Sequence, residues 1–339
     1  MIRNIDSKPA ITKGLNPSSS MCKHLILLTL FLCIVLPRMA FSQQYDQYSL
    51  YMFSPGIYNP ASAGMSEALN LQAGWRNQWI GFTDQEGSNV NPKSYFAAIS
   101  APIYAINSGL GLMISRQDLA YQQRTDIRLD YALKIPFKEG QFLSVGISGK
   151  LSRLNLNIDK LIPTDPTDPL IKKTGSHQSN VPEMGTGLLY TSKKLMAGIS
   201  LMNLLGSEFE LGNIIMQDQP TFTAMAQYRI NLIEERFKKV DLAPSFLIKS
   251  SINSTQIDLN LLGYVNDRFW GGAGYRLQDG LILMAGAGLG QFDAGISYDF
   301  TTSKMKEATG KGSLELQIRY GFPVYPPVRA SSGFNTRHL

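Results

Sequence analysis

Apolar and polar residues alternate with a period of two through most of the chain from about residue 69 onward. In the stretch 125–134, every second residue is apolar, and most of the residues between are charged. Successive side chains of a β-strand point to opposite faces, so this alternation predicts strands with one apolar and one polar face. The same pattern returns at 141–152, 239–249, 291–299 and 314–320.

Two architectures share this pattern. A soluble sandwich or barrel turns its apolar faces inward, whereas a membrane barrel turns them toward lipid and encloses the polar faces. Many segments run to roughly 9–12 residues, which suits a tilted membrane strand, whereas soluble strands average about 5 or 6. Tyrosines and phenylalanines lie near segment ends, as in the aromatic girdles of membrane barrels. We therefore predict an all-β fold, a transmembrane antiparallel β-barrel.

The predicted barrel covers residues 68–322 and has about 14 strands. They lie near 68–78, 93–101, 108–117, 123–136, 140–153, 184–191, 194–203, 220–231, 238–250, 254–264, 267–277, 280–289, 291–300 and 313–322. An even number places both ends of the barrel in the periplasm, with short turns there and long loops outside. The long connections, near 79–92, 154–183, 204–219 and 301–312, are all odd-numbered, as this orientation requires. Among the even-numbered connections, only 231–237 is long.

The predicted inner face carries charges of both signs. They are Arg76, Arg128, Asp130, Lys150, Arg229, Asp241, Lys249, Asp258, Arg268, Arg276, Asp293, Asp299, Glu315 and Arg319. These residues either line a water-filled pore or pair with one another and with a plug. Selective pores usually present rings of one sign, so the mixture favours pairing.

The residues before the barrel divide into three parts. Residues 21–42 have the charged start, apolar run and small-residue end of a cleavable signal peptide. Residues 1–20 are interpreted as a mis-called upstream extension, and residues 43–67 as a periplasmic segment or a plug tucked into the barrel mouth. Removal of residues 1–42 takes away both cysteines, five basic residues and one acid, which lowers the formal charge from +6 to about +2. The basic balance therefore gives no argument for nucleic-acid binding.

Candidate chemistry is sparse after residue 42. The two histidines, His177 and His338, lack the neighbouring groups that a catalytic triad needs. Asp165 and Asp168 lie in a DPTDP segment that is typical of turns rather than of a calcium site. Glycine clusters near 109–111, 271–274 and 286–290 lie inside alternating strands, where glycine relieves crowding, and not in a strand–turn–helix phosphate loop. We predict no enzyme activity, no metal site and no cofactor.

Several motifs resemble the PorP/SprF family, in the right order and over almost the whole mature chain. They are Gln47–Phe53, Asn59–Gly64, Arg76–Phe82, Phe269–Arg276, Gly295–Ser303 and Gly312–Glu315. The resemblance implies an outer-membrane protein of the type IX secretion system of Bacteroidetes. Such proteins assist the secretion or surface attachment of large cargo such as adhesins, and some serve gliding motility. The chain departs from the family at Leu314, where a histidine is common, and in a tail at 323–339.

The residues that carry this resemblance form a candidate site, with a structural or partner-contact role. They are Asn59, Pro60, Gly64, Arg76, Gln78, Trp79, Gly81, Phe82, Tyr275, Arg276, Tyr298 and Asp299. Strand parity places Trp75 and Trp79 near the outer interface and Arg76 in the lumen. The implied partners are a cargo or adhesin C-terminal domain, other type IX components and outer-membrane lipid. A general porin or solute channel is the alternative function.

Overall fold

The computed structural model describes residues 47–66, 68–84, 86–138, 140–160, 175–252, 254–302 and 311–324. The predicted upstream extension and signal peptide, the DPTDP segment, His338 and nearly all of the C-terminal tail lie outside the described residues. No helix among the described residues is long and apolar enough to cross a bilayer.

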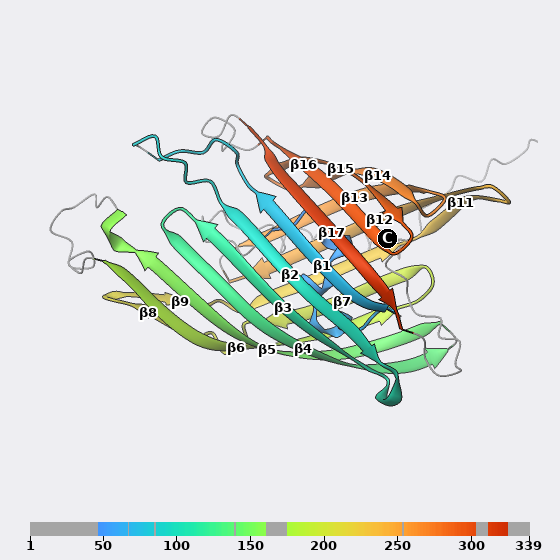
Figure 1. Cartoon of the computed structure of the whole chain (residues 1–339), viewed down its shortest axis with the longest axis horizontal. Coiled ribbons are helices and arrows are strands. Elements are labelled where there is room, and N and C mark those ends of the chain that lie inside the picture. The colour runs from blue at the N-terminus through green and yellow to red at the C-terminus, as the bar shows by residue number, and fades with distance from the viewer. Residues whose placement is uncertain are drawn as a thin grey trace, which may run out of the picture. The chain divides into compact units, whose positions relative to one another are not determined.

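The described strands form one antiparallel sheet that closes on itself, plus a separate hairpin (Figure 1). The first half consists of β1 (Ala68–Asn77), β2 (Lys93–Ile103), β3 (Ser108–Leu119), β4 (Gln122–Lys138), β5 (Gln141–Asn157), β6 (Ser176–Thr191) and β7 (Leu195–Met202). The second half consists of β10 (Thr221–Tyr228), β11 (Ile230–Glu235), β12 (Lys238–Ser251), β13 (Thr255–Val265), β14 (Phe269–Arg276), β15 (Gly280–Leu289), β16 (Phe292–Thr301) and β17 (Ser313–Pro323). Pairing of β1 with β17 closes the barrel.

The prediction of 14 strands in an all-β barrel is confirmed. β10 and β11 both pair with β12 and are separated by Arg229 alone, so they form one wall strand. Each predicted strand corresponds to one wall strand, and every described neighbouring pair is antiparallel. The connections at the rim where β1 begins and β17 ends are all short, and one of them contains the short 3-10 helix η4 (Tyr104–Ile106). The long connections lie at the opposite rim.

Three predicted loops are wrong in part, because their residues continue the sheet. β5 and β6 stay paired to Asn157↔Ser176, beyond the predicted ends of both strands, and the short 3-10 helix η5 (Ile158–Lys160) follows β5. The connection 204–219 contains the hairpin β8 (Glu208–Leu211) and β9 (Ile214–Gln217). Apolar residues of this hairpin and of the extended β5–β6 wall bury one another, which alternation within a single segment does not reveal. The third segment, 231–237, is largely strand β11.

The predicted orientation of the faces is confirmed. On β4, Ile127 and Leu129 are 47% and 58% exposed, whereas Arg128 between them is 3% exposed. Of the charged residues predicted to face inward, only Arg268 does not, because it lies in the exposed turn before β14. Exposed aromatic residues occur at or near strand ends. They include Phe137, Phe222, Tyr228, Phe269, Tyr275, Phe292, Phe300, Tyr320 and Phe322.

The barrel interior is filled by residues 47–66, which we call the N-terminal segment. It contains three single-turn 3-10 helices, η1 (Tyr51–Phe53), η2 (Pro55–Ile57) and η3 (Pro60–Ser62). Its apolar side chains pack against inward-facing apolar residues of the wall. These include Leu189, Met196, Met225, Leu247, Leu262, Tyr264, Trp270, Ile282 and Met284. The inner face is therefore part polar and part apolar, which corrects the expectation of a polar lumen lining.

Candidate functional site

The first candidate site is a buried charged cluster around Ser49, which we call the Ser49 cluster. It joins that serine to two arginines and three carboxylates from five wall strands. They are Arg76 of β1, Asp258 of β13, Arg276 of β14, Asp299 of β16 and Glu315 of β17. All are at most 4% exposed, so these charges are removed from water and depend on one another.

The arginines hold the carboxylates in short ion pairs. Arg276 lies 3.0 Å from Asp258 and 2.9 Å from Asp299, and Arg76 lies 2.6 Å from Asp299. Both guanidinium groups also donate to the Ser49 hydroxyl at 3.0 Å, and that hydroxyl donates to Asp299 at 2.8 Å. One serine of the N-terminal segment therefore lies at the junction of both arginines.

The third carboxylate, Glu315, is satisfied largely by the N-terminal segment. Its pair with Arg76 is 3.1 Å long, and its oxygens accept the backbone N–H groups of Ser49 at 2.6 Å and Leu50 at 3.1 Å. Three carboxylates face two arginines in the cluster, so these N–H groups help to compensate the extra negative charge. The segment and the charged wall therefore stabilise each other.

The other end of the N-terminal segment is held by Asn59. Its side-chain amide donates to the carbonyl of Leu188 at 2.9 Å and to that of Ile199 at 3.1 Å, which are opposite residues on β6 and β7. Its side-chain oxygen accepts the N–H of Ala61 at 2.9 Å and so caps η3. One asparagine thus fixes both the local fold of the segment and its place on the wall.

Three wall glycines make this close approach possible. A Cβ atom at Gly109, Gly146 or Gly187 would lie 2.2, 2.2 or 2.1 Å from an atom of the N-terminal segment, well inside van der Waals contact. Elsewhere, a Cβ at Gly286 would lie 2.1 Å from the ring of Trp270, which stacks on Phe53 with ring centroids 4.2 Å apart. The interpretation of strand glycines as relief of crowding therefore agrees with the structure at Gly109 and Gly286, whereas Gly290 lies in the turn after β15 with no atom near its Cβ.

Replacing Gly146 by alanine is expected to lower the free energy of unfolding by about 1–3 kcal/mol, because the new methyl group meets the backbone of Ala61. Gly149 on the same strand has no atom within 4 Å of a Cβ and serves as the matched control. Gly149→Ala should change stability by less than about 0.5 kcal/mol. Urea titration of the detergent-solubilised barrel measures both, and equal effects would contradict this account of the contact.

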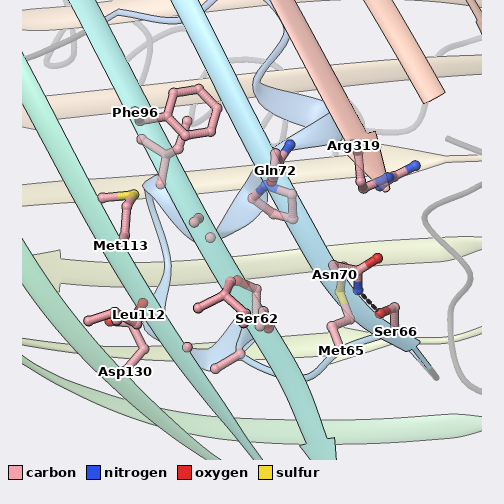
Figure 2. Close-up of a pocket in the computed structure, with 18 of the residues that line it drawn as sticks. Ser62, Met65, Ser66, Asn70, Gln72, Phe96, Leu112, Met113, Asp130 and Arg319 are labelled. Atoms are coloured by element: carbon pink, nitrogen blue, oxygen red, sulfur yellow. Dashed lines mark hydrogen bonds between the residues drawn. The ribbon is translucent and has the colours of Figure 1, made fainter. Parts of the chain in front are cut away.

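A cavity of about 80 Å³ remains between the N-terminal segment and the wall, where strands β1 to β4 and Arg319 of β17 line it. Figure 2 shows side chains from both sides of it, among them Ser62 and Met65 of the segment and Phe96 and Asp130 of the wall. At roughly 10–15 Å³ for each water molecule, this volume holds a few waters. The cavity is therefore space left around the segment and is too small for a nutrient solute.

The structure divides the predicted signature residues into three groups. Asn59, Pro60, Gly64, Arg76, Arg276 and Asp299 lie inside the barrel, as parts of the N-terminal segment or in contact with it. Gln78, Trp79, Gly81 and Phe82 lie in the connection after β1, at the rim with the long connections. Tyr275 and Tyr298 point away from the lumen, and Tyr275 is 46% exposed. Within the first group, Arg76, Arg276 and Asp299 meet in the Ser49 cluster, whereas Asn59, Pro60 and Gly64 lie at the other end of the N-terminal segment.

The connection after β1 is folded against its neighbours. Ile80 N–H donates to the carbonyl of Gly312 at 3.0 Å, and Trp79 N–H donates to the Ser313 hydroxyl at 3.1 Å. Trp79 therefore lies beyond the end of β1, in the connection predicted at 79–92. Asp84 of the same connection accepts a bond of 2.5 Å from the hydroxyl of Tyr121, in the turn between β3 and β4, and this bond holds the pKa of the Asp84 carboxyl below its usual value.

Sequence reasoning missed Ser49 and the inward apolar residues. Ser49 was part of a recognised motif, but nothing local marks it as the centre of a charged cluster. The apolar lining had a signal, because neighbouring apolar residues such as Leu188–Leu189 and Leu261–Leu262 interrupt the alternation and give a strand two apolar faces. Such doublets predict contact with something inside the barrel.

No arrangement for catalysis or metal binding is found in the part of the chain that the structure describes. His177 lies on β6 opposite Leu156, and none of the described ion pairs involves it. Within the same residues, no group of three or more His, Cys, Asp or Glu side chains could hold a metal ion.

Comparison with known families gives one match, to the family described as the type IX secretion system membrane protein PorP/SprF, over residues 40–320. A comparison with curated protein sequences gave no significant match.

Solved structures with a similar fold include three membrane barrels. CdiB from Acinetobacter baumannii has a TM-score of 0.44 and 9% identity, over 75% of this chain and 60% of that one. A Pseudomonas aeruginosa FadL homologue has a TM-score of 0.39 and 11% identity, over 82% and 95%. The CymD monoaromatic hydrocarbon channel has a TM-score of 0.46 and 12% identity, over 84% and 95%. At these values nothing about function follows from the similarity.

Proposed function

Because this chain belongs to the PorP/SprF family of type IX secretion system membrane proteins, we propose that it is a non-enzymatic docking partner for exported cargo. It is an outer-membrane β-barrel, and its family ties it to the secretion system. The proposed cargo is a large surface protein such as an adhesin, recognised through its C-terminal domain. A role in gliding motility would follow if that adhesin moves on the cell surface.

The occupied interior carries this proposal. The N-terminal segment fills the barrel and is bonded to the wall at both ends, and the two cavities described beside it are each about 80 Å³. A general solute channel requires a continuous water-filled path, so this filling favours a protein that works through its surfaces. In this proposal, Asn59, Arg76, Arg276 and Asp299 hold the plug in place.

The exterior contact surface in this proposal is the rim with the long connections, which includes Gln78, Trp79, Gly81 and Phe82. Gly81 has a φ of 88°, a conformation in which other residues are strained, and it allows the connection to fold back toward Gly312. Recognition residues commonly lie on loops held by a rigid scaffold. Tyr275 and Tyr298, on the outward face, are assigned to the membrane interface.

Deletion of the gene in its native host tests this function. We expect at least one large cargo to disappear from the cell surface, and the wild-type gene or a Gly149→Ala copy to restore it. Surface labelling and immunoblotting of each secreted cargo provide the measurement. Unchanged display and attachment of every such cargo would contradict the proposal.

A further inference from the structure

One hairpin projects from the rim that carries the short turns. β7 pairs with β10 as far as Tyr228↔Leu195, and the last bond on that side runs from Arg229 N–H to the Lys194 carbonyl at 2.7 Å. Beyond this point β11 pairs only with β12 among the described strands. Figure 1 shows β11 reaching past the neighbouring strands at this end of the barrel.

The free edge of β11 offers backbone hydrogen-bonding groups to a partner strand. In an antiparallel ladder, the N–H and C=O of one residue point to the same side, and the side alternates along the strand. Glu235 pairs with Lys238 across a two-residue turn, so the backbone groups of Glu234 point to the open side. The six residues Ile230–Glu235 give an edge of about 20 Å, the length of an average strand.

Apolar side chains flank this edge. Ile230 and Leu232 are 37% and 57% exposed, and Phe237 at the hairpin tip is 84% exposed. A projecting edge with apolar neighbours invites pairing with another chain unless it is blocked.

A second strand, β4, also has a free edge at this rim, but that edge is blocked. Comparison of β4 with β11 shows what blocking requires. β4 runs beyond its partner β3, because the last bond from that side is Lys134 N–H to the Asn107 carbonyl. The projecting end of β4 carries Pro136, which has no N–H to donate at that edge. β11 contains no proline, and although its register with β12 shifts between Asn231 and Ile233, Glu234 beyond the shift keeps its edge N–H.

We propose that β11 is a docking site for an extended strand of a periplasmic protein, which adds to the open edge by backbone hydrogen bonds. The even number of strands places the rim where β1 begins and β17 ends in the periplasm. The incoming strand presents apolar side chains to Leu232 and Phe237. The identity of the partner as a secretion component rests on the proposed function, whereas the edge itself does not.

Photocrosslinking in intact cells tests this site, with p-benzoylphenylalanine in place of Phe237. We expect an adduct with one periplasmic protein. The crosslinker is also placed at position 237 of a chain that carries Glu234→Pro. This substitution removes an edge N–H without removing a bond to β12, and it should lower the yield of the adduct about tenfold or more. Glu234→Ala loses the same side chain, including its bond with Asn231, but keeps the N–H, so its adduct should stay within about twofold of the parent.

Each other outcome would overturn the proposal. These outcomes are an adduct that survives Glu234→Pro, an adduct lost equally in Glu234→Ala, an adduct with a second copy of this chain, and no protein adduct. Heat-modifiability on gels confirms that each variant forms the barrel. If crosslinking fails while gene deletion still removes cargo from the surface, only this inference is wrong.

Discussion

Replacing Arg276 by alanine is expected to destabilise the barrel by about 3–5 kcal/mol, the largest effect of any single substitution considered. Arg276 is 1% exposed and bonds through its Nε and Nη2 atoms to Asp258 at 3.0–3.1 Å. Without it, Asp258 keeps only the 2.7 Å bond from the Gln256 amide among the described contacts. An uncompensated buried carboxylate is far more costly than the loss of an ion pair at a surface.

Arg268→Ala is the matched control for this prediction. It removes an arginine of the preceding turn whose side chain is exposed, and its described hydrogen bonds use backbone atoms. It should change stability by less than about 0.5 kcal/mol. The loss of stability in Arg276→Lys should lie between the losses in Arg276→Ala and Arg268→Ala. Lysine keeps the positive charge but lacks the planar guanidinium group that bonds a carboxylate through two nitrogens. Urea titration followed by tryptophan fluorescence gives all three values, and similar values for Arg276→Ala and Arg268→Ala would refute the cluster's role.

Deleting residues 47–66 is expected to convert a closed barrel into a conducting one. The N-terminal segment occupies the lumen through the Ser49 cluster at one end and Asn59 at the other. After deletion, water would enter the lumen and solvate the charged wall, including Glu315. In planar bilayers we expect no stable channel steps from the intact mature barrel and clear single-channel steps from the deletion variant.

A milder variant guards against loss of folding in the deletion. Ser49→Ala with Asn59→Ala removes the hydroxyl between the two arginines and the amide that holds η3, while the backbone N–H groups to Glu315 remain. Brief, intermittent openings are expected from it, and none from Gly149→Ala. Steady conductance by the intact barrel would support the alternative of a general solute channel.

The alternation of single residues predicted most of the wall. Arg128 between Ile127 and Leu129 indicated which face turns inward, and the same reasoning applied to every strand gave the correct number of strands. Arg268 was the one misplaced charge, because it lies in a turn, where alternation has no meaning. The hairpin β8–β9 was missed because its apolar residues are buried by β5 and β6, which are distant in sequence.

For the signature residues, the sequence identified the residues but did not indicate which of them are in contact. The resemblance named Arg76, Arg276 and Asp299 as important, yet their positions, 200 and 23 residues apart along the chain, do not say that they meet. They meet because β1 pairs with β17 and so brings the first strand beside the last ones. Ser49, which joins them, has no distinguishing local feature at all.

The sequence by itself determined the number of wall strands, the face each side chain takes, and the choice of lipid outside and charge inside. These follow from the period of the strand and from the cost of exposing polar groups to lipid. Only the tertiary structure decided what fills the barrel, which charges pair, and which strand edge stays open. Those outcomes depend on closure of the sheet and on contacts between residues far apart in the chain, which no local pattern encodes.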